Sequence, residues 1–425
     1  MKTKNDIAWE KIFKDYPVVE SVNKDEFFSI TSLQINEYRE ARLMTKFDFH
    51  KQLPSIFREN GLAILPTSRG SYVIGRFKIF ESIDINTRLE AIGVAKPEGI
   101  ETIDIEDISS ETTALLCANI SGILKDFFDE DYILHTIGGR MGSGDFDFYI
   151  SDLPIEVSKS QIEIDGGFES DNFVYLVEVK NLIHDEFLTR QIYYPFRVWK
   201  QKLEERKIDK AVRNIFLTYS DGLFYLREYG FEDVYDPTTI RIIKEAKYSI
   251  VKDSLSIDDL KNLVLESEIV KDPDIPFPQS NDLYKTINLC ELIYYGDKVM
   301  SKEDITEEFG FVHRQAGYYG DSARYLGLLD YVDKKYVLTE LGEKTFSKPL
   351  KQRQFELAKI ILSHEPFNIV MANYLDKGVS PSTEEIKKLI YHCKLYNVGK
   401  EGSTFGRRCS TIKSWINWIL DRVDV

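Results

Sequence analysis

The stretch QIEIDGGFESDNFVYLVEVKN, residues 161–181, constrains the fold of this chain more than any other part of it. Apolar and charged residues alternate on both sides of a glycine pair, and a period of two is typical of β-strands that bury one face. We therefore predict a β-hairpin in which Gly166 and Gly167 form the turn that brings the two strands together.

Four charged residues stand in these otherwise apolar strands: Glu163, Asp165, Glu178 and Lys180. Burial of an unpaired charge is costly, so these charges either face water as a cross-strand ion pair or serve a chemical purpose. Because alternate residues of a strand share a face, pairing of the strands would gather the carboxylates beside the lysine. Such a group suits Mg²⁺, and the lysine can position or deprotonate a water or stabilise charge on a phosphate. The pattern predicts metal-assisted hydrolysis of a phosphodiester.

An aspartate followed by Glu-x-Lys across two strands resembles the active site of the PD-(D/E)XK nuclease superfamily. Asp165 matches the motif aspartate and Glu178-Val179-Lys180 matches the Glu-x-Lys, thirteen residues further on, while Ile164 replaces the usual proline. More widely, the segments GRMGSGDFDFYI, QIEIDGGFE, LVEVKN, FLTRQIYYPFRVW and IFLTYSDGLFYL are similar to those of type II restriction endonucleases.

The resemblance implies a role for each matching residue. Asp165 and Glu178 would hold Mg²⁺, and Lys180 would orient the attacking water. Glu163 shares the face of Asp165 and would assist as a further ligand or partner. Gln191 lies in the helix expected after the lysine strand, which often supplies a polar residue near the metal or the scissile phosphate.

A second assignment of the motif aspartate stays open. Asp145 and Asp147 also lie on an alternating stretch before the Glu-x-Lys strand, more than thirty residues ahead of Glu178. Asp165 is favoured because it lies in the adjacent strand of the hairpin.

The chain has 425 residues, 43% of them hydrophobic, which predicts more than one domain. The proline-containing segment 271–282 reads as a linker. We expect an N-terminal α/β domain over 1–108 that contacts DNA, a nuclease domain over 109–270, and a DNA-recognition domain over 281–425. The fold class is α/β in the mixed α+β sense, with a PD-(D/E)XK-like central mixed sheet flanked by helices and a helical, winged-helix-like C-terminal domain.

Local patterns place the main elements. Two strands joined by a Ser-Arg-Gly turn are expected within 63–83, and an Asp-Gly turn is expected to join two further strands. A short hairpin at 334–346 is expected to complete the winged helix. The expected helices run over 109–130, 184–205 with a bend at Pro195, 284–296, 301–310 and 312–332, and other expected strands over 145–151, 211–220 and 222–231.

The formal net charge of −15 and the pI near 5.1 argue mildly against a nucleic-acid partner, although a basic cleft can exist on an acidic protein. The third helix of a winged helix reads the major groove in DNA-binding proteins, and a Ser/Thr-rich helix start near the C-terminus favours phosphate. The residues expected to contact DNA are Arg140, Arg190, Arg314, Gln315, Arg324, Arg407, Arg408 and Lys413.

These observations predict a sequence-specific type II restriction endonuclease that cleaves double-stranded DNA with Mg²⁺. The resemblance implies a companion DNA methyltransferase, and double-strand cleavage implies two active sites, hence a homodimer or transient pairing on DNA. Neither a signal peptide nor a membrane-spanning run is recognised, so we expect a cytoplasmic protein with reduced cysteines and an ordinary His392. The alternatives are a non-catalytic winged-helix DNA-binding regulator and a modification-dependent DNA nuclease.

Overall fold

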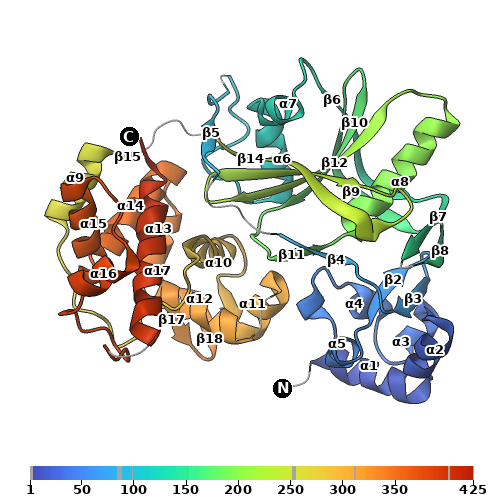
Figure 1. Cartoon of the computed structure of the whole chain (residues 1–425), viewed down its shortest axis with the longest axis horizontal. Coiled ribbons are helices and arrows are strands. Elements are labelled where there is room, and N and C mark those ends of the chain that lie inside the picture. The colour runs from blue at the N-terminus through green and yellow to red at the C-terminus, as the bar shows by residue number, and fades with distance from the viewer. Residues whose placement is uncertain are drawn as a thin grey trace. The chain divides into compact units, whose positions relative to one another are not determined.

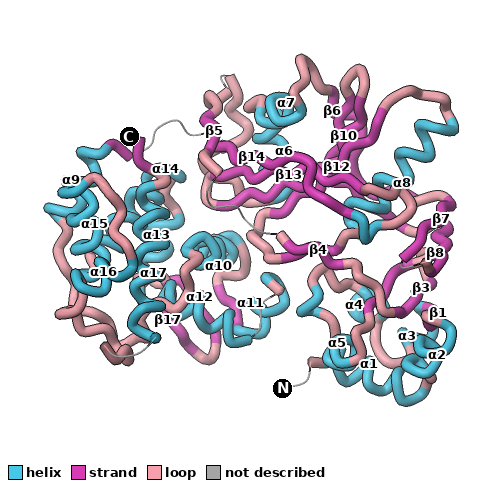
Figure 2. The backbone as a smooth tube through the Cα atoms, viewed as in Figure 1, coloured by secondary structure: helices cyan, strands magenta, loops and turns pink. Residues whose placement is uncertain are grey.

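The computed structural model describes residues 3–83, 89–97, 99–150, 152–250, 255–310, 313–400 and 403–424. The chain forms two compact units (Figures 1 and 2). The first comprises Met1–Ile92, Ser110–Tyr219 and Phe224–Tyr248, and the second comprises Gly93–Ser109, Ser220–Leu223 and Ser249–Val425. The three domains expected from the sequence stay a prediction.

The N-terminal part of the first unit packs short helices around a three-stranded sheet of order β1-β3-β2. Strands β2 and β3 are antiparallel, which confirms the hairpin expected there. Trp9 and Phe57 are fully buried in its core. The elements are α1 (Lys4–Asp15), α2 (Val18–Asp25), β1 (Phe27–Thr31), α3 (Ser32–Asn36), α4 (Ala41–Thr45), η1 (His50–Gln52), α5 (Ser55–Glu59), β2 (Ala63–Pro66) and β3 (Ser71–Gly75).

A seven-stranded sheet of order β5-β14-β13-β12-β10-β9-β6 forms the centre of the first unit. It is a mixed sheet, because β9 is antiparallel to both β6 and β10 whereas β10 and β12 are parallel. The predicted fold class, a mixed sheet flanked by helices with a helical C-terminal region, is confirmed. The strands are β5 (Ala91–Gly93), β6 (Leu134–Gly142), β9 (Gln161–Glu169), β10 (Phe173–Lys180), β12 (Ala211–Ser220), β13 (Leu223–Phe231) and β14 (Ile240–Ser249).

Helices α6 and α8 both pack against β9 and β10, and α8 is the crossover that parallel strands such as β10 and β12 require (Figure 1). Two small two-stranded sheets, β11-β4 and β7-β8, accompany the central sheet. These elements are α6 (Glu111–Ile120), α7 (Ile123–Phe128), α8 (Arg190–Glu205), β4 (Phe80–Ser82), β7 (Asp145–Ile150), β8 (Leu153–Ser158), β11 (Glu186–Leu188) and η2 (Pro237–Thr239).

The hairpin of β9 and β10 is present, but its predicted turn is wrong. Gly166 and Gly167 lie inside β9 and pair with Val177 and Leu176, so the chain reverses at 170–172 instead. The glycines serve close packing. A Cβ atom at Gly166 would lie 2.5 Å from Leu115 of α6, and one at Gly167 would lie 2.6 Å from the Cβ of Ile137 on β6.

Two helix predictions also need correction. The expected helix over 109–130 starts behind the Ser110 cap but divides into α6 and α7, because Gly122 adopts a left-handed backbone with φ of 81°. The expected helix over 184–205 begins only at Arg190, since β11 occupies its first part. Pro195 lies within α8 without ending it. The Asp221–Gly222 turn between β12 and β13 is as predicted, with positive φ at both residues.

The second unit contains the predicted order of a winged helix: α10, α11, α12 and a hairpin of β17 and β18, to which β16 adds a third strand. Ser301 caps α11 through a capping box. The expected hairpin at 334–346 is misplaced, because Glu340–Phe346 forms α13 and the hairpin's other strand, β17, lies earlier. The expected helix over 312–332 correspondingly ends at Tyr325 and gives way to β17. The elements are α10 (Leu283–Tyr295), β16 (Val299–Ser301), α11 (Lys302–Phe309), α12 (His313–Tyr325), β17 (Leu329–Val332) and β18 (Lys335–Leu338).

Further helices complete the second unit. They are α9 (Ile257–Glu266), α13 (Glu340–Phe346), α14 (Leu350–Leu362), α15 (Glu365–Lys377), α16 (Thr383–Leu389) and α17 (Ser403–Leu420), with the short strands β15 (Leu255–Ser256) and β19 (Val423–Asp424). Across the described ranges, none of the helices combines the length and apolar character that crossing a membrane requires.

The segment expected to be a linker, 271–282, is packed into the second unit. Phe277 is 1% exposed and stacks on Phe367. The indole of Trp415 donates to the carbonyl of Ser280 at 3.1 Å. This segment therefore holds a defined position beside α15 and α17.

Candidate active site

Asp165, Glu178 and Lys180 lie together where β9 and β10 diverge. The backbone ladder between the two strands ends at the pair Val177 and Gly166. Beyond that pair, the carboxylate of Asp165 accepts a hydrogen bond from the backbone N–H of Val179 at 2.8 Å. The Asp165 side chain thus takes the place of a backbone acceptor just beyond the last strand pair, and it lies beside Glu178 and Lys180.

The ammonium group of Lys180 is held by carboxylates. Its Nζ lies 2.6 Å from Oε1 of Glu178 and donates to the carbonyl of Val179 at 3.1 Å. Its side chain is 17% exposed and that of Glu178 is 11% exposed. This is a partly buried pair and not an ion pair on an exposed strand face, which was the alternative considered for these residues.

Glu111 is a further member of this cluster that the sequence did not identify. It lies in the first turn of α6, and its Oε1 is 3.8 Å from Nζ of Lys180. Gly166 allows the approach, because it leaves room for Leu115, which lies one turn along the same face of α6. An acidic residue after a serine cap is ordinary in any helix, so no local signal marks Glu111. We call Glu111, Asp165, Glu178 and Lys180 the carboxylate–lysine cluster.

The charges of this cluster shift the pKa values of its members. Burial, with help from Asp165 and Glu111, raises the pKa of Glu178 to about 7, although Lys180 opposes the change. Burial also raises the pKa values of Asp165 and Glu111. Burial alone would lower the pKa of Lys180, but Glu178 and Glu111 outweigh it and raise that pKa. Three carboxylates therefore compete for one ammonium group.

This set of donors fits a hard divalent cation. Oδ1 of Asp165 and Oε2 of Glu178 make no hydrogen bond within the part of the chain that the structure describes. Mg²⁺ prefers oxygen ligands from one or two carboxylates together with water. A dication would also offset the burial and the mutual repulsion that raise the carboxyl pKa values. Asp165 and Glu178, with Glu111 beside them, are the residues that would hold it.

Glu163 lies at the margin of this cluster. It is near enough to Asp165 to raise that residue's pKa. Its carboxylate is 57% exposed, however, and its Oε1 is 3.2 Å from Nε of Arg140 on the paired strand β6. Arg140, expected to contact DNA, is thus exposed and paired with Glu163.

Asp145 and Asp147, the alternative motif aspartates, lie on β7 in a separate two-stranded sheet with β8. Oδ1 of Asp145 accepts a hydrogen bond from Ser158 at 2.7 Å. No described contact joins either residue to Lys180. The geometry favours Asp165 as the partner of Glu178.

Arg190 and Gln191 open α8, which packs on the two strands of the cluster. Oε1 of Gln191 and Nε of Arg190 are buried, and no hydrogen-bond partner is found for them among the described residues. The Arg190 guanidinium lies 5.6 Å from the ring centre of Tyr194. No described contact links Gln191 to the carboxylates, so its supporting role stays a prediction.

Three of the residues expected to contact DNA line one cavity in the second unit: Arg314, Arg407 and Arg408. The volume of this cavity, which we call the arginine pocket, is about 530 Å³. Arg314 comes from α12, and the other two arginines come from α17. The lining consists of Pro276, Phe277, Gln279, Asn281, Arg314, Tyr318, Tyr396, Asn397, Val398, Thr404, Arg407, Arg408 and Ser410.

The other residues expected to contact DNA lie outside this lining. Arg324 lies on α12, but its Nη1 is 3.0 Å from a carboxylate oxygen of Asp321. Gln315 on α12 and Lys413 on α17 are both half-buried. Helices α12 and α17 therefore bring Arg314, Arg407 and Arg408 to one cavity. Gln315, Arg324 and Lys413, on the same two helices, do not line it.

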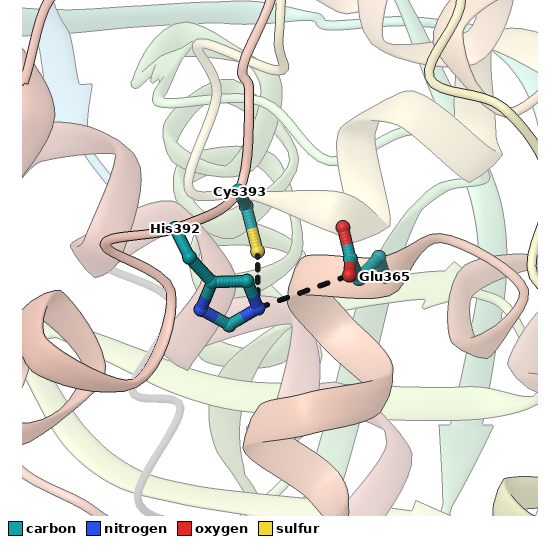
Figure 3. Close-up of side chains that lie close together, drawn as sticks. All are labelled: Glu365, His392 and Cys393. Carbon is teal, nitrogen blue, oxygen red and sulfur yellow. Dashed lines mark hydrogen bonds and ion pairs between the residues drawn. The ribbon is translucent and has the colours of Figure 1, made fainter.

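A second group of potential metal ligands lies in the second unit (Figure 3). The imidazole of His392 lies between the thiol of Cys393 and the carboxylate of Glu365, with Nε2 at 3.8 Å from each. Burial, with Glu365 and Asp272, raises the pKa of Cys393 to about 12. Nitrogen and sulfur donors suit Zn²⁺ and not Mg²⁺. His392 was expected to be ordinary, and the sequence marks no such group, because Glu365 lies 27 residues before His392. The four cysteines are free.

The fold and cluster define a mixed α+β protein with a carboxylate–lysine site at one end of two central strands. Three family models match the chain, each described as a domain of unknown function: DUF6996 over 6–74, DUF6997 over 75–249 and DUF7226 over 285–424. No curated protein and no solved structure matches the chain. The second match contains the whole carboxylate–lysine cluster, and the third contains all three pocket arginines.

Proposed function

We propose that the protein is a Mg²⁺-dependent endonuclease of double-stranded DNA, of the type II restriction class that the sequence resembles. The observation that carries the proposal is the convergence of Asp165, Glu178 and Lys180 on one partly buried site, with Lys180 Nζ 2.6 Å from Glu178. The resemblance to the PD-(D/E)XK superfamily rests on these same three residues. The arginine pocket supports a nucleic-acid substrate.

The proposed role of Lys180 follows from its protonation state. Because the neighbouring carboxylates raise its pKa, the amine is an ammonium ion near neutral pH. It therefore donates hydrogen bonds to the attacking water or to a phosphate oxygen, and its charge stabilises the negative charge that develops there. Removal of a proton from the water falls to another group, because an ammonium ion cannot accept a proton and Glu178 is a proposed ligand of Mg²⁺.

The remaining residues fix the geometry. Asp165 is oriented by its hydrogen bond from Val179, so its free oxygen and that of Glu178 are held in place. When bound, Mg²⁺ would supply Lewis-acid polarisation of the scissile phosphate. Glu111 anchors the ammonium group of Lys180 from the opposite element, α6.

The wider biological setting follows from this class of enzyme. Sequence-specific cleavage would require a companion methyltransferase to protect host DNA, and cutting both strands would require two active sites, hence a homodimer or transient pairing. Such an enzyme would act in the cytoplasm. The methyltransferase, the pairing of two active sites and the cytoplasmic location are part of the proposal and rest on the class of enzyme, not on the geometry of the site.

Plasmid digestion tests the proposal. Wild type is expected to give discrete fragments with MgCl₂ and none with EDTA, whereas Lys180→Ala and Glu178→Ala give none with MgCl₂. Lys200→Ala is the matched control, because it removes an exposed lysine that pairs with Glu204 on the surface of α8. Methylated and unmethylated plasmids digested side by side separate a restriction enzyme from a modification-dependent nuclease. DNA binding by wild type without cleavage under any divalent ion would overturn the proposal in favour of a non-catalytic regulator.

A further inference from the structure

The arginine pocket concentrates positive charge in an acidic protein. The chain carries 70 acidic and 55 basic residues, yet none of the described residues that line this cavity is an aspartate or a glutamate. No ion pair to a described carboxylate is found for Arg314, Arg407 or Arg408. Such a lining favours an anionic ligand.

Arg408 supplies the strongest single observation. Its side chain lines the cavity although the residue is only 7% exposed. Nη1 donates to the carbonyl of Pro278 at 3.2 Å, but the buried Nε has no hydrogen-bond partner among the described residues. Burial of a guanidinium group that has no carboxylate partner is costly, and an anion in the cavity would offset that cost.

The neighbouring arginines are available as well. Nη2 of Arg407 donates to the hydroxyl of Thr404 at 3.4 Å, a long contact with a neutral group. Arg314 donates to the hydroxyl of Tyr318, and its guanidinium lies 5.3 Å from the centre of that ring. Thr404 lies in the first turn of α17, where backbone N–H groups favour phosphate.

The cavity is too large for a phosphate alone. Its volume of about 530 Å³ lies in the usual range of small-molecule pockets, whereas a water occupies about 30 Å³ of liquid. The remaining lining includes the aromatic rings of Tyr318 and Tyr396 and the amides of Asn281 and Asn397. Aromatic faces stack on nucleobases and amides hydrogen-bond to their edges.

We infer that the arginine pocket binds a single nucleotide of the DNA substrate that has been extruded from the duplex. Its phosphate would lie against Arg407 and Arg408, and its base against the tyrosines and amides. This inference rests on the proposed function, since it takes DNA as the substrate. Arg314 and Tyr318 lie on α12, the third helix of the winged helix, so the element expected to approach the groove also lines the pocket.

The first test measures binding by the full chain without divalent ions, so that no cleavage occurs. Titration calorimetry compares the four deoxynucleoside monophosphates with the corresponding nucleosides and with inorganic phosphate. At least one monophosphate is expected to bind clearly more tightly than its nucleoside and than phosphate. Arg407→Ala and Arg314→Ala should each weaken that binding by about tenfold or more, as expected for a lost charge-assisted hydrogen bond. Lys388→Ala, which removes an exposed lysine of α16 outside the cavity, should leave it unchanged.

The outcomes separate the possibilities. Binding of inorganic phosphate as tight as that of every monophosphate would reduce the cavity to an anion site and overturn the inference, as would no binding at all. A second assay places 2-aminopurine at each position of a bound duplex, where extrusion raises its fluorescence. No fluorescence change at any position, or an increase that survives in Arg407→Ala, would also overturn it. Because both assays omit divalent ions, they are independent of the Lys180→Ala test of cleavage.

Discussion

The carboxylate–lysine cluster and the arginine pocket carry opposite excesses of charge. In the cluster, three carboxylates share one ammonium group, and burial raises the carboxyl pKa values. In the pocket, three arginines meet with no described carboxylate among the lining residues. The first site therefore has an excess of negative charge and the second an excess of positive charge. The comparison indicates that one site would act on a phosphate through a metal, whereas the other would hold substrate directly.

The largest effects are expected when one residue of each site is changed, which tests whether the cluster governs cleavage and the pocket governs binding. Glu178→Gln should slow single-turnover cleavage by about 10³-fold, the scale of loss when a preorganised electrostatic partner is removed from an active site. Its affinity for DNA should change little. Arg407→Ala should weaken DNA binding by about tenfold and leave the cleavage rate at saturating DNA unchanged. If both variants lost DNA affinity and cleavage rate to the same extent, the assignment of cleavage to the cluster and of binding to the pocket would be wrong.

A smaller effect is expected at Glu111. Glu111→Gln keeps the shape of the side chain but removes the charge 3.8 Å from Lys180. We expect cleavage to slow by roughly ten- to a hundredfold, because Lys180 loses one of its two carboxylate contacts. Single-turnover rates of this variant, compared with those of Glu106→Gln, which removes a half-buried carboxylate paired with Lys96 in the second unit, measure the effect. A rate equal to that of wild type would remove Glu111 from the site.

Gly166 gives a prediction on stability. In Gly166→Ala the new methyl group would meet Leu115 of α6 at 2.5 Å, and such overpacking costs about 1–3 kcal/mol. Cleavage should also slow, since α6 carries Glu111. Gly142→Ala is the matched control, because a Cβ at this glycine of β6 meets nothing within 4 Å. Chemical denaturation of both variants measures the difference, and equal unfolding free energies would contradict the packing role of Gly166.

The smallest effect concerns pH. The pKa of Glu178 is raised to about 7 in the folded protein from an ordinary 4.5, so the metal-free folded state binds this proton more tightly than the unfolded state does. The associated stability is fully present below about pH 4.5 and is lost as pH rises through 7. Mg²⁺ binds the ionised carboxylate, so it should raise the melting temperature by a few degrees more at pH 8 than at pH 6. Glu178→Gln should abolish this difference; a shift that is equal at both pH values in wild type would contradict the assignment.

The two sites also differ in how far the sequence predicts them. Asp165, Glu178 and Lys180 lie on neighbouring strands within sixteen residues of one another, and strand alternation predicts which residues of each strand share a face. The register that places Asp165 beside Glu178 is set by the reversal at 170–172, which the sequence did not predict. The turn was misplaced because a glycine pair predicts a reversal and equally permits close packing. In β9 the neighbours Leu115 and Ile137 decide between the two, and both are distant in the sequence.

The pocket could be predicted only in part. Arg314, Arg407 and Arg408 were expected to contact DNA for local reasons, namely a third helix and a Ser/Thr-rich helix start. Nothing local shows that residues about ninety positions apart line one cavity. The segment 271–282 was expected to be a linker, because its prolines break periodicity, yet Phe277 is buried and the indole of Trp415 donates to the carbonyl of Ser280. Tertiary packing overrides such local signals.

The hydrogen bond from the Val179 N–H to Asp165 has a consequence for the design of inactive variants. Asp165, a proposed metal ligand, also holds two strands together at the point where their backbones part. Alanine in its place would therefore weaken the strand pairing as well as remove the proposed ligand. Asp165→Asn keeps an oxygen that can accept the hydrogen bond from the Val179 N–H but removes the negative charge. This substitution therefore separates the proposed metal ligation from the strand pairing. Asp165 is therefore the residue of the cluster whose substitution is hardest to interpret, because a loss of activity could arise from a lost ligand or from altered strand pairing.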